Sequence, residues 1–302
     1  MKTTKTNTMK TPTNQPNIES IKPLSEAEMK TLLCIVDDKG GVGKSADAAH
    51  LRDALMELGY RVRIADADSL NRTLSQLIPD VDENGRPVVT RLDGDKPTEM
   101  INYILETATA EEDVTIIDMP GGSSKILNKA KISLDVFKQA GIRVVVVIAI
   151  TEELDAVVGS RAWLKAYGTR VEYLVIANEK QCADGEPFNP EKVPGLQPII
   201  SATGGRLAIV PKFSEILMKI YQEKKSSPKG YMAGGWAAKS LGLNVVYSGL
   251  WQAQLQKVIE SIAPHAEFLT GKPIPKPVTV AEKTEKDYGM DDLCSQLDAL
   301  AP

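Results

Sequence analysis

Short, nearly uninterrupted apolar runs alternate along this chain with longer segments in which apolar residues recur every three or four positions. The apolar runs at 31–37, 61–66, 114–118, 143–150 and 171–178 predict buried strands. The segments between them predict helices at 44–60, 99–110, 125–141 and 152–168. Strands that are apolar on both faces and alternate with helices are typical of a parallel sheet covered on both sides. We therefore expect an α/β fold, a doubly wound and mainly parallel sheet with helices on both faces.

The pattern becomes less regular after residue 180. Four prolines and two glycines at 184–198 predict a surface loop. A short strand at 208–211, a helix at 213–225 and a closing helix at 248–263 follow. We expect this region to complete the same folded domain.

The two ends of the chain lack a sustained apolar pattern. Residues 1–28 are rich in Thr, Lys, Asn and Pro, which predicts a disordered arm. Residues 266–302 are Pro- and Lys-rich and then acidic, which predicts a mobile tail. The expected folded domain therefore spans residues 29–265.

Composition narrows the chemistry. The only two histidines are His50 and His265, so a Ser-His-Asp or Cys-His catalytic set is improbable. The cysteines, Cys34, Cys182 and Cys294, are isolated, which argues against a metal cluster within one chain and suits a reducing cytoplasm. The net charge of −4 creates no overall basic field for nucleic acid. No apolar run approaches the roughly 20 residues of a membrane helix, and no secretory signal is evident.

The stretch DDKGGVGKS, residues 37–45, lies between a predicted strand and a predicted helix, the context that a phosphate-binding P-loop requires. Its glycines let backbone N–H groups approach phosphate, and the helix N-terminus adds partial positive charge. Lys44 is expected to reach the β- and γ-phosphates, and Ser45 to bind Mg²⁺. The residues expected to hold the nucleotide phosphates are Gly40, Gly41, Val42, Gly43, Lys44, Ser45 and Ala46.

The sequence KGGVGKS resembles the deviant Walker A motif of the ParA/MinD group of P-loop ATPases. The resemblance implies ATP and Mg²⁺ as cofactors and a homodimer that forms on ATP binding. It also implies that Lys39 crosses the dimer interface to the phosphates bound by the other subunit. A solvated loop lysine is the alternative for Lys39.

Carboxylates follow two further predicted strands. Asp66 and Asp68 end the strand at 61–66, and the resemblance implies that Asp68 positions the attacking water while Asp66 lies near the metal. Asp118 ends the strand at 114–118, and the resemblance implies that it binds Mg²⁺ through water. Carboxylates at strand C-termini face the phosphate crevice of an open α/β sheet, which agrees with these roles.

Two weaker similarities concern the nucleotide base. The resemblance implies that Asn178 hydrogen-bonds the adenine edge and that Pro211 lines the base pocket, although an asparagine after a strand is often only a turn residue. The chain departs from the family pattern at Asp37 and Asp38, and at Asp47, where the family often has Thr. We expect one of the acids before the loop to hold Lys39 back by an ion pair.

Within the family, the acidic C-terminal segment argues against membrane binding. The plasmid partition and conjugative-element branch is the nearest, with a role in DNA partition or in positioning a DNA-transfer complex. A stimulating partner protein is expected for this slow ATPase, in the cytoplasm or on the nucleoid. Nonspecific DNA binding is expected through a patch that is equally consistent with a solvated surface: Lys212, Lys219, Lys224, Lys225 and Lys229, extended by Lys239. The alternatives are a kinase or ligase acting on a small substrate, and a nucleotide-gated adaptor with little hydrolysis.

Overall fold

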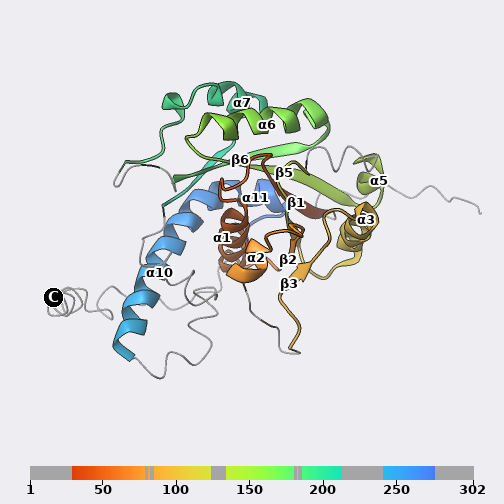
Figure 1. Ribbon diagram of the computed structural model, residues 1–302. Helices are drawn as coiled ribbons and strands as arrows, with labels where there is room; N and C mark the ends of the chain where they lie inside the picture. The colour runs from red at the N-terminus through yellow and green to blue at the C-terminus, as the bar shows by residue number, and fades with distance from the viewer. Residues whose placement is uncertain are drawn as a thin grey trace, which may run out of the picture.

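The computed structural model describes residues 29–78, 81, 85–123, 134–179, 182, 186–212 and 241–275. Seven strands form one sheet in the order β3-β2-β4-β1-β5-β6-β7, and every neighbouring pair is parallel (Figure 1). The strands are β1 Lys30–Val36, β2 Val62–Asp66, β3 Val89–Arg91, β4 Val114–Asp118, β5 Ile142–Ile150, β6 Glu172–Asn178 and β7 Leu207–Val210. The sequence-based fold class is confirmed.

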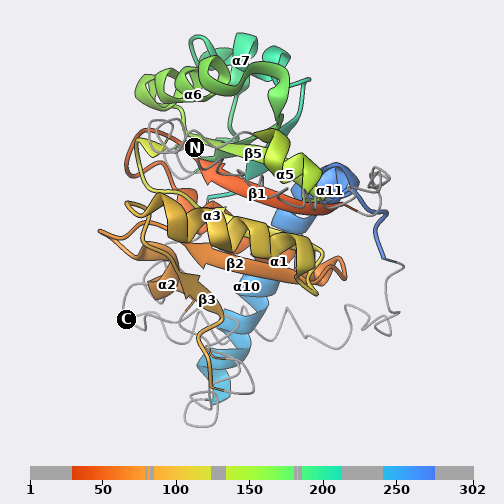
Figure 2. The same ribbon diagram turned by 90° about the vertical axis from the view of Figure 1, so that its right-hand side faces the viewer.

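Helices cover both faces of the sheet. Figures 1 and 2 show α6 and α7 on one side of it, with α1 and α10 on the other. The α-helices are α1 Lys44–Glu57, α2 Thr73–Leu77, α3 Pro97–Glu106, α5 Leu134–Gln139, α6 Leu154–Tyr167, α7 Leu196–Ala202, α10 Leu241–Ile262 and α11 Ala266–Thr270.

Strand β1 shows why the sequence forms two core layers. Successive side chains of a strand point to opposite faces. Leu33 and Ile35 therefore pack in the layer of α1 and α10, while Leu32 and Cys34 pack in the layer of α3, α5, α6 and α7. All of these side chains are buried, so β1 reads as a continuous apolar run.

The strand order places the P-loop at the point where the chain changes direction across the sheet. Strand β1 lies between β4 and β5, and the chain passes from β4 to β5 across it. In open α/β sheets, ligands bind at the carboxyl ends of the strands at such a point. The loop after β1 therefore occupies the expected position for a ligand site.

Several elements differ from the sequence-based expectation. Helix α7 begins inside the segment expected to be a surface loop and extends beyond it, because Leu196 and Ile199 bury one helical face after Gly195 begins it with a left-handed φ of 79°. The short β3 and α2 were not predicted, since three and five residues carry too little periodicity.

The boundary of the folded domain also moves. Helix α11 lies where the mobile tail was expected to begin, but Leu269 and Thr270 are fully buried. The Thr31 hydroxyl donates to the Thr270 carbonyl at 3.0 Å, and the Tyr60 hydroxyl donates to the Lys272 carbonyl at 3.0 Å. The folded domain thus includes residues up to 275, because this segment is hydrogen-bonded to the amino-terminal end of β1 and to Tyr60.

The predicted helix at 213–225, the N-terminal arm at 1–28 and the tail beyond 275 lie outside the described residues. Among the helices that the structure describes, none combines the length and apolar character needed to cross a membrane.

Candidate functional site

The P-loop adopts a conformation that needs glycine at two positions. Gly41 and Gly43 have φ angles of 83° and 105°, in the left-handed region that side chains with a Cβ rarely occupy. Gly43 caps α1, and its carbonyl accepts from the Asp47 N–H at 2.9 Å. A Cβ on Gly43 would also lie 2.7 Å from Asn178 Nδ2. The loop therefore requires glycine for both backbone shape and close packing.

Lys44 is buried at the start of α1, and its ammonium is held by the loop itself. Nζ donates to the Lys39 carbonyl at 3.0 Å, and only 9% of the residue is exposed. A helix N-terminus and an ammonium at one point create a strongly anion-attracting position. The loop can thus bind phosphate by exchanging one internal hydrogen bond for contacts to the ligand.

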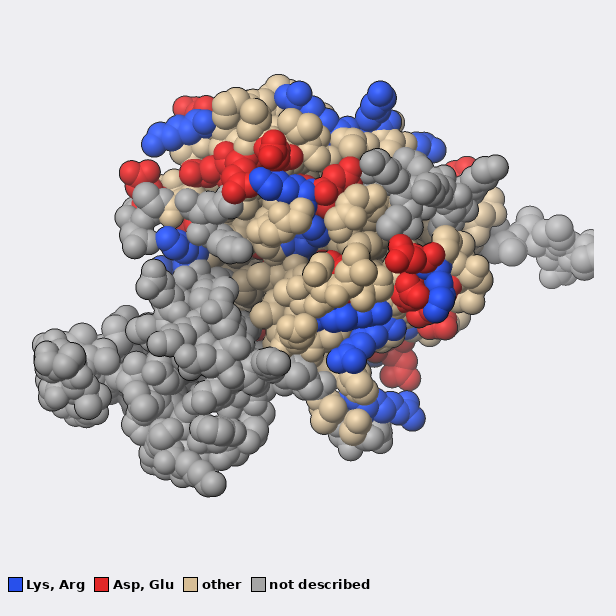
Figure 3. Space-filling view, in the orientation of Figure 1, with Lys and Arg blue, Asp and Glu red and all other residues tan. Residues whose placement is uncertain are grey.

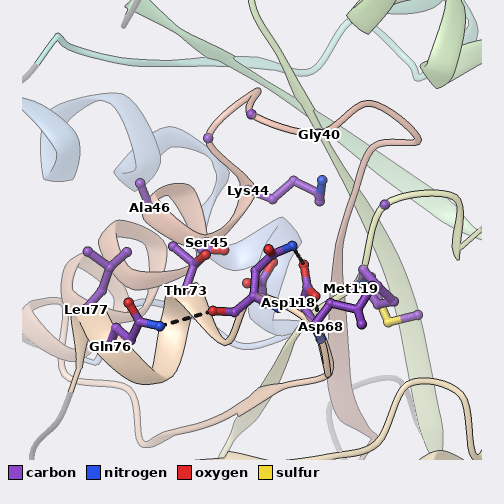
Figure 4. A pocket seen from close by; sticks show the side chains of 16 residues that line it. Gly40, Lys44, Ser45, Ala46, Asp68, Thr73, Gln76, Leu77, Asp118 and Met119 are labelled. Carbon is purple, nitrogen blue, oxygen red and sulfur yellow. Dashed lines mark hydrogen bonds between the residues drawn. The ribbon is translucent and has the colours of Figure 1, made fainter.

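A pocket of about 790 Å³ opens beside the loop (Figure 4). One wall is the P-loop and the start of α1, and the opposite wall is the β2–α2 segment. The lining residues are Gly40, Gly41, Gly43, Lys44, Ser45, Ala46, Asp68, Leu70, Asn71, Thr73, Gln76, Leu77, Asp118, Met119, Pro120 and Gly121. The structure thus brings together most of the residues predicted to contact phosphate, and Val42 instead packs in the core against Ala149 and Ala156.

Asp118 is the most unusual group in the pocket. The residue is 1% exposed, and neither carboxylate oxygen has a hydrogen-bond partner of normal geometry. The pKa of Asp118 is raised to about 7, mainly by burial and also by the negative charge of Asp66, against the lowering effect of the nearby Ser45 hydroxyl and Lys44. A buried carboxylate without a hydrogen-bond partner destabilises the folded state unless a cation or a hydrogen-bond donor binds it.

Asp68 lies across the pocket from the P-loop at the end of β2. Its Oδ1 accepts from the backbone N–H groups of Leu70 and Asn71 at 3.1 and 3.0 Å. Its Oδ2 accepts from Asn71 Nδ2 at 3.2 Å (Figure 4). These three hydrogen bonds fix the carboxylate at the pocket wall while leaving the residue partly exposed.

Asp66 is the register partner of Asp118 on the neighbouring strand, so it lies beside the carboxylate expected to bind the metal. It is fully buried and is not among the pocket-lining residues. Its Oδ2 accepts from both the N–H and the hydroxyl of Ser75 at 2.9 Å, and its Oδ1 accepts from the Asp68 N–H at 3.1 Å. In the structure, Asp66 anchors α2 and the Asp68 loop, so it supports the site from behind.

Ser45 and Asp118 form a donor set that fits Mg²⁺. Mg²⁺ is usually held by one or two protein oxygens together with substrate phosphates and water. The unpartnered Asp118 carboxylate beside the Ser45 hydroxyl supplies such oxygens. Within the described part of the chain, no cluster of three or more His, Cys, Asp or Glu forms a metal cage.

The ammonium of Lys39 pairs with acids that the sequence reading did not single out. Nζ is hydrogen-bonded to Glu153 Oε2 and lies 3.7 Å from Asp155 Oδ2, both at the start of α6. Of the two acids before the loop, one of which was expected to pair with this ammonium, Asp37 instead accepts from the Lys39 backbone N–H at 2.5 Å. The pairing with Glu153 arises because β5 ends beside β1, which brings the Glu153 segment to the loop. Figure 3 shows acidic side chains gathered below α6, with basic side chains among them.

The two residues expected at the base lie away from the pocket. Asn178 ends β6 and is 6% exposed, and its Nδ2 donates to Asp47 Oδ1 at 2.8 Å. Pro211 directly follows β7, the strand next to β6. Both therefore lie on the β6–β7 side of the P-loop, opposite to the pocket on the β2–β4 side.

The proposed DNA patch is described only at one member. Lys212 is half-buried, and its Nζ donates to the Cys182 carbonyl at 3.2 Å, so this lysine has a role in loop packing. The remaining members, Lys219, Lys224, Lys225, Lys229 and Lys239, lie outside the described residues.

Sequence reasoning missed the wall formed by α2 and the residues that brace it. Asn71 binds Asp68, and Arg72 Nη1 donates to the carbonyls of Asp66 and Leu92 at 2.7 and 2.6 Å. Arg72 also has a φ of 50°, the only left-handed residue other than glycine among those described. The polar run SLNRTLSQ after the Asp-x-Asp pair was the available signal, because short polar side chains commonly cap the turn before a helix.

Comparisons with known proteins agree with this geometry. Residues 33–288 match the model of the CbiA family, the CobQ/CobB/MinD/ParA nucleotide binding domain. A search of curated proteins finds no match.

Similar solved structures include the septum site-determining protein MinD with Mg-ADP from Pyrococcus horikoshii OT3. It is 17% identical with a TM-score of 0.48, covering 80% of this chain and 98% of that one. A ParA family ATPase from Chlorobium tepidum TLS is 15% identical with a TM-score of 0.47, covering 79% and 98%. The MinC:MinD cell division protein complex of Aquifex aeolicus is 17% identical with a TM-score of 0.46. The match covers 82% of this chain and 98% of that one. These similarities are too distant to carry a functional argument.

The family match spans most of the chain, and it includes the loop, the pocket and the carboxylates described above. The chain belongs to the CobQ/CobB/MinD/ParA nucleotide-binding domain family.

Proposed function

We propose that this protein is a Mg²⁺-dependent ATPase switch of the ParA type, which dimerises on ATP and releases the dimer after hydrolysis. The observation that supports it best is the buried, unpartnered Asp118 carboxylate beside Ser45 and Lys44 in an open pocket. A nucleotide-bound Mg²⁺ would satisfy the carboxylate, and the phosphates would satisfy Lys44. Nucleotide binding thus completes groups that the protein leaves incomplete.

The phosphate end of ATP binds at the P-loop. Lys44 exchanges the Lys39 carbonyl for phosphate oxygens, and the N-terminus of α1 contributes its backbone N–H groups. Ser45 and Asp118 would hold Mg²⁺, which would supply positive charge beside the phosphates. The unusual pKa of Asp118 returns towards its ordinary range once a cation is beside it.

Asp68 orients the attacking water. Its carboxylate faces the same pocket as Lys44, and three hydrogen bonds from Leu70 and Asn71 fix it in place. A carboxylate held in this way can accept a hydrogen bond from water without moving. Asp68 thus contributes by position, as expected of phosphoryl transfer, where positioning dominates catalysis.

Lys39 serves the nucleotide of a second subunit. In the structure its ammonium pairs with Glu153 and Asp155 of its own chain, so it must leave these acids before it reaches the partner's phosphates. The exchange of one anionic partner for another costs little, because exposed ion pairs contribute about 0–1 kcal/mol. Dimerisation therefore depends on the γ-phosphate of ATP as the stronger anion.

The biological output that we propose is partition of a plasmid or mobile element, or positioning of a DNA-transfer complex. A ParB-like or transfer-complex protein stimulates a slow basal hydrolysis. Nonspecific DNA binding depends on the lysines beyond Lys212, because the ammonium of Lys212 binds the Cys182 carbonyl.

Sedimentation in the presence of Mg-ATP, Mg-ADP or no nucleotide tests the switch. We expect a dimer with ATP and a monomer in the other two conditions. Lys39→Ala is expected to bind ATP and remain monomeric, whereas Lys165→Ala, at an exposed position on α6, is expected to behave as wild type. Equal sedimentation with ATP and ADP would contradict the switch.

A second candidate function is supported by the extent of the pocket. Its volume of about 790 Å³ lies within the range of roughly 300–1,000 Å³ for small-molecule sites, and its far wall is formed by α2 residues such as Thr73, Gln76 and Leu77. A kinase or ligase would use that wall for a small substrate beside the γ-phosphate. A monomer that turns over ATP only when a small acceptor is added would favour this enzyme over the switch.

A further inference from the structure

The end of β6 is joined to the first turn of α1 by a buried hydrogen bond. Asn178 Nδ2 donates to Asp47 Oδ1 at 2.8 Å, between residues 131 positions apart in the sequence. Asp47 is 0% exposed and Asn178 is 6% exposed. Gly43 lies against the same amide, since a Cβ there would be 2.7 Å from Nδ2. The P-loop, α1 and β6 therefore meet at the Asn178 side chain.

Asp47 determines which way that amide faces. Its Oδ1 accepts from the NH₂ group of Asn178, which directs the carbonyl Oδ1 of that amide away from Asp47. A threonine hydroxyl, which the family often has here, can donate as well as accept and would allow either orientation. Because both residues are buried, where a mismatched pair of polar groups is costly, one orientation of the amide is preferred.

The position of the pair indicates which part of a nucleotide it faces. Asp68 and Asp118 line the pocket on the β2–β4 side of the P-loop, so the terminal phosphate belongs there. Asn178 lies on the β6 side of the same loop. A nucleotide with its phosphates at Lys44 and its terminal phosphate on the β2–β4 side would extend its base towards that second side.

We propose that Asp47 is a specificity-determining residue that selects adenine over guanine by fixing the orientation of the Asn178 amide. The inference rests on the proposed ATPase function. Adenine carries an amino donor at C6, which the Asn178 carbonyl accepts through one of its two lone pairs. Guanine carries a carbonyl at C6, which would meet that carbonyl acceptor to acceptor. A buried mismatch of this kind leaves two acceptors without donors and opposes binding.

The test compares the affinities of nonhydrolysable ATP and GTP analogues by calorimetry for wild type, Asp47→Asn and Asp47→Thr. We expect the wild type to prefer ATP by about 100-fold or more, as for sites that reject a mismatched hydrogen-bonding group. An asparagine or a threonine at position 47 can donate to Oδ1, which lets the amide turn its NH₂ group towards the base. In both variants the preference for ATP over GTP is therefore expected to be about tenfold smaller than in wild type, mainly because GTP binds more tightly.

A control variant separates specificity from a general effect on α1. Asp53→Asn removes another buried carboxylate of the same helix, one that pairs with Arg52 at 2.8 Å. We expect its ATP-to-GTP ratio to equal that of wild type. The Asn178 side-chain amide resonances give a second readout, since they should shift in Asp47→Asn and Asp47→Thr but not in Asp53→Asn.

Three outcomes would overturn the inference. They are an unchanged ATP-to-GTP ratio in both Asp47 variants, an equal loss of affinity for both nucleotides, and a wild type that binds both nucleotides equally. A wild type that binds neither nucleotide would also overturn the proposed function. Failure of the inference alone is thus distinguishable, because ATP would still bind and still drive dimerisation.

Discussion

The two sides of the P-loop differ in how completely their buried polar groups are satisfied. On the β2–β4 side, the Asp118 carboxylate has no hydrogen-bond partner of normal geometry, and the pocket is open. On the β6 side, Asn178 is joined to Asp47 at 2.8 Å and packs against Gly43. On the second side, folding alone gives one Asp47 oxygen its hydrogen bond, whereas on the first side both Asp118 oxygens depend on something that binds. The difference indicates that phosphate and metal complete one half of the site, while the other half is preorganised.

The largest effect is expected from Lys44→Ala. Charge-assisted hydrogen bonds contribute roughly 1.5–3 kcal/mol each, so loss of this ammonium should weaken ATP binding by about 100-fold or more. Calorimetry measures the effect, with Lys165→Ala as the matched surface control. Unchanged ATP affinity in Lys44→Ala would show that phosphate does not bind at Lys44 on the β2–β4 side.

Asp118→Asn should have opposite effects on stability and activity. Replacing a buried, unpartnered carboxylate by a neutral amide should raise the free energy of unfolding by about 1–2 kcal/mol. The same change should lower Mg²⁺-dependent hydrolysis by about 100-fold. Denaturant unfolding and phosphate release measure the two effects. A variant that is both less stable and fully active would show that Asp118 does not hold a cation on the β2–β4 side.

On the preorganised side, Asp47→Ala should reduce stability. The Asn178 amide loses that acceptor while it stays buried, which costs about 1–3 kcal/mol in the free energy of unfolding. Denaturant unfolding without nucleotide measures the cost. A gain in stability, as expected for Asp118→Asn, would erase the contrast between the two sides.

Asp37 should make stability depend on pH. It is fully buried at the end of β1, and burial raises its pKa from 3.8 to about 7, although the Lys39 N–H and Lys44 lower it. Because the folded pKa is the higher one, the folded state binds the proton more tightly. The associated stability is present below pH 3.8 and is lost as pH rises through about 7.

Asp37→Asn mimics the protonated carboxyl and should flatten this dependence. The variant should resemble wild type at pH 5 and be more stable than wild type at pH 8. Thermal unfolding at both values measures the difference. The same slope in wild type and variant would assign the pH dependence to another group.

The smallest effect is expected from Glu153→Gln. The Lys39–Glu153 pair is partly exposed, with side-chain exposures of 29% and 41%, so its loss should change the free energy of unfolding by less than about 1 kcal/mol. ATP-driven dimerisation should occur at the same or a lower ATP concentration, because Lys39 is released more easily. A variant that no longer dimerises would show that Glu153 is needed in the dimer itself.

The sequence was a good guide to the fold and to the open side of the site. Buried parallel strands read as continuous apolar runs, and glycines, Lys44 and the strand-end aspartates have fixed positions relative to such strands. The partners of these groups were harder to predict. Glu153 reaches Lys39 only because β5 ends next to β1, and Asp47 reaches Asn178 only because β6 ends next to the loop.

Short elements and paired acids account for the remaining differences. Helix α2 has five residues and no clear period, so the far wall of the pocket was not expected. Asp66 and Asp68 look equivalent in the sequence, but strand pairing buries Asp66 against Ser75 and leaves Asp68 in the pocket wall. Such distinctions depend on tertiary contacts that carry no local pattern.

Phosphate release by Asp68→Ala is the most direct test of the central claim, that the open side carries out Mg²⁺-dependent ATP hydrolysis. The variant and the wild type would be compared at saturating Mg-ATP, with sedimentation of the same samples. We expect the variant to bind ATP and to accumulate as a dimer, with phosphate release lowered by about 100-fold or more. Hydrolysis at the wild-type rate in Asp68→Ala would contradict the account.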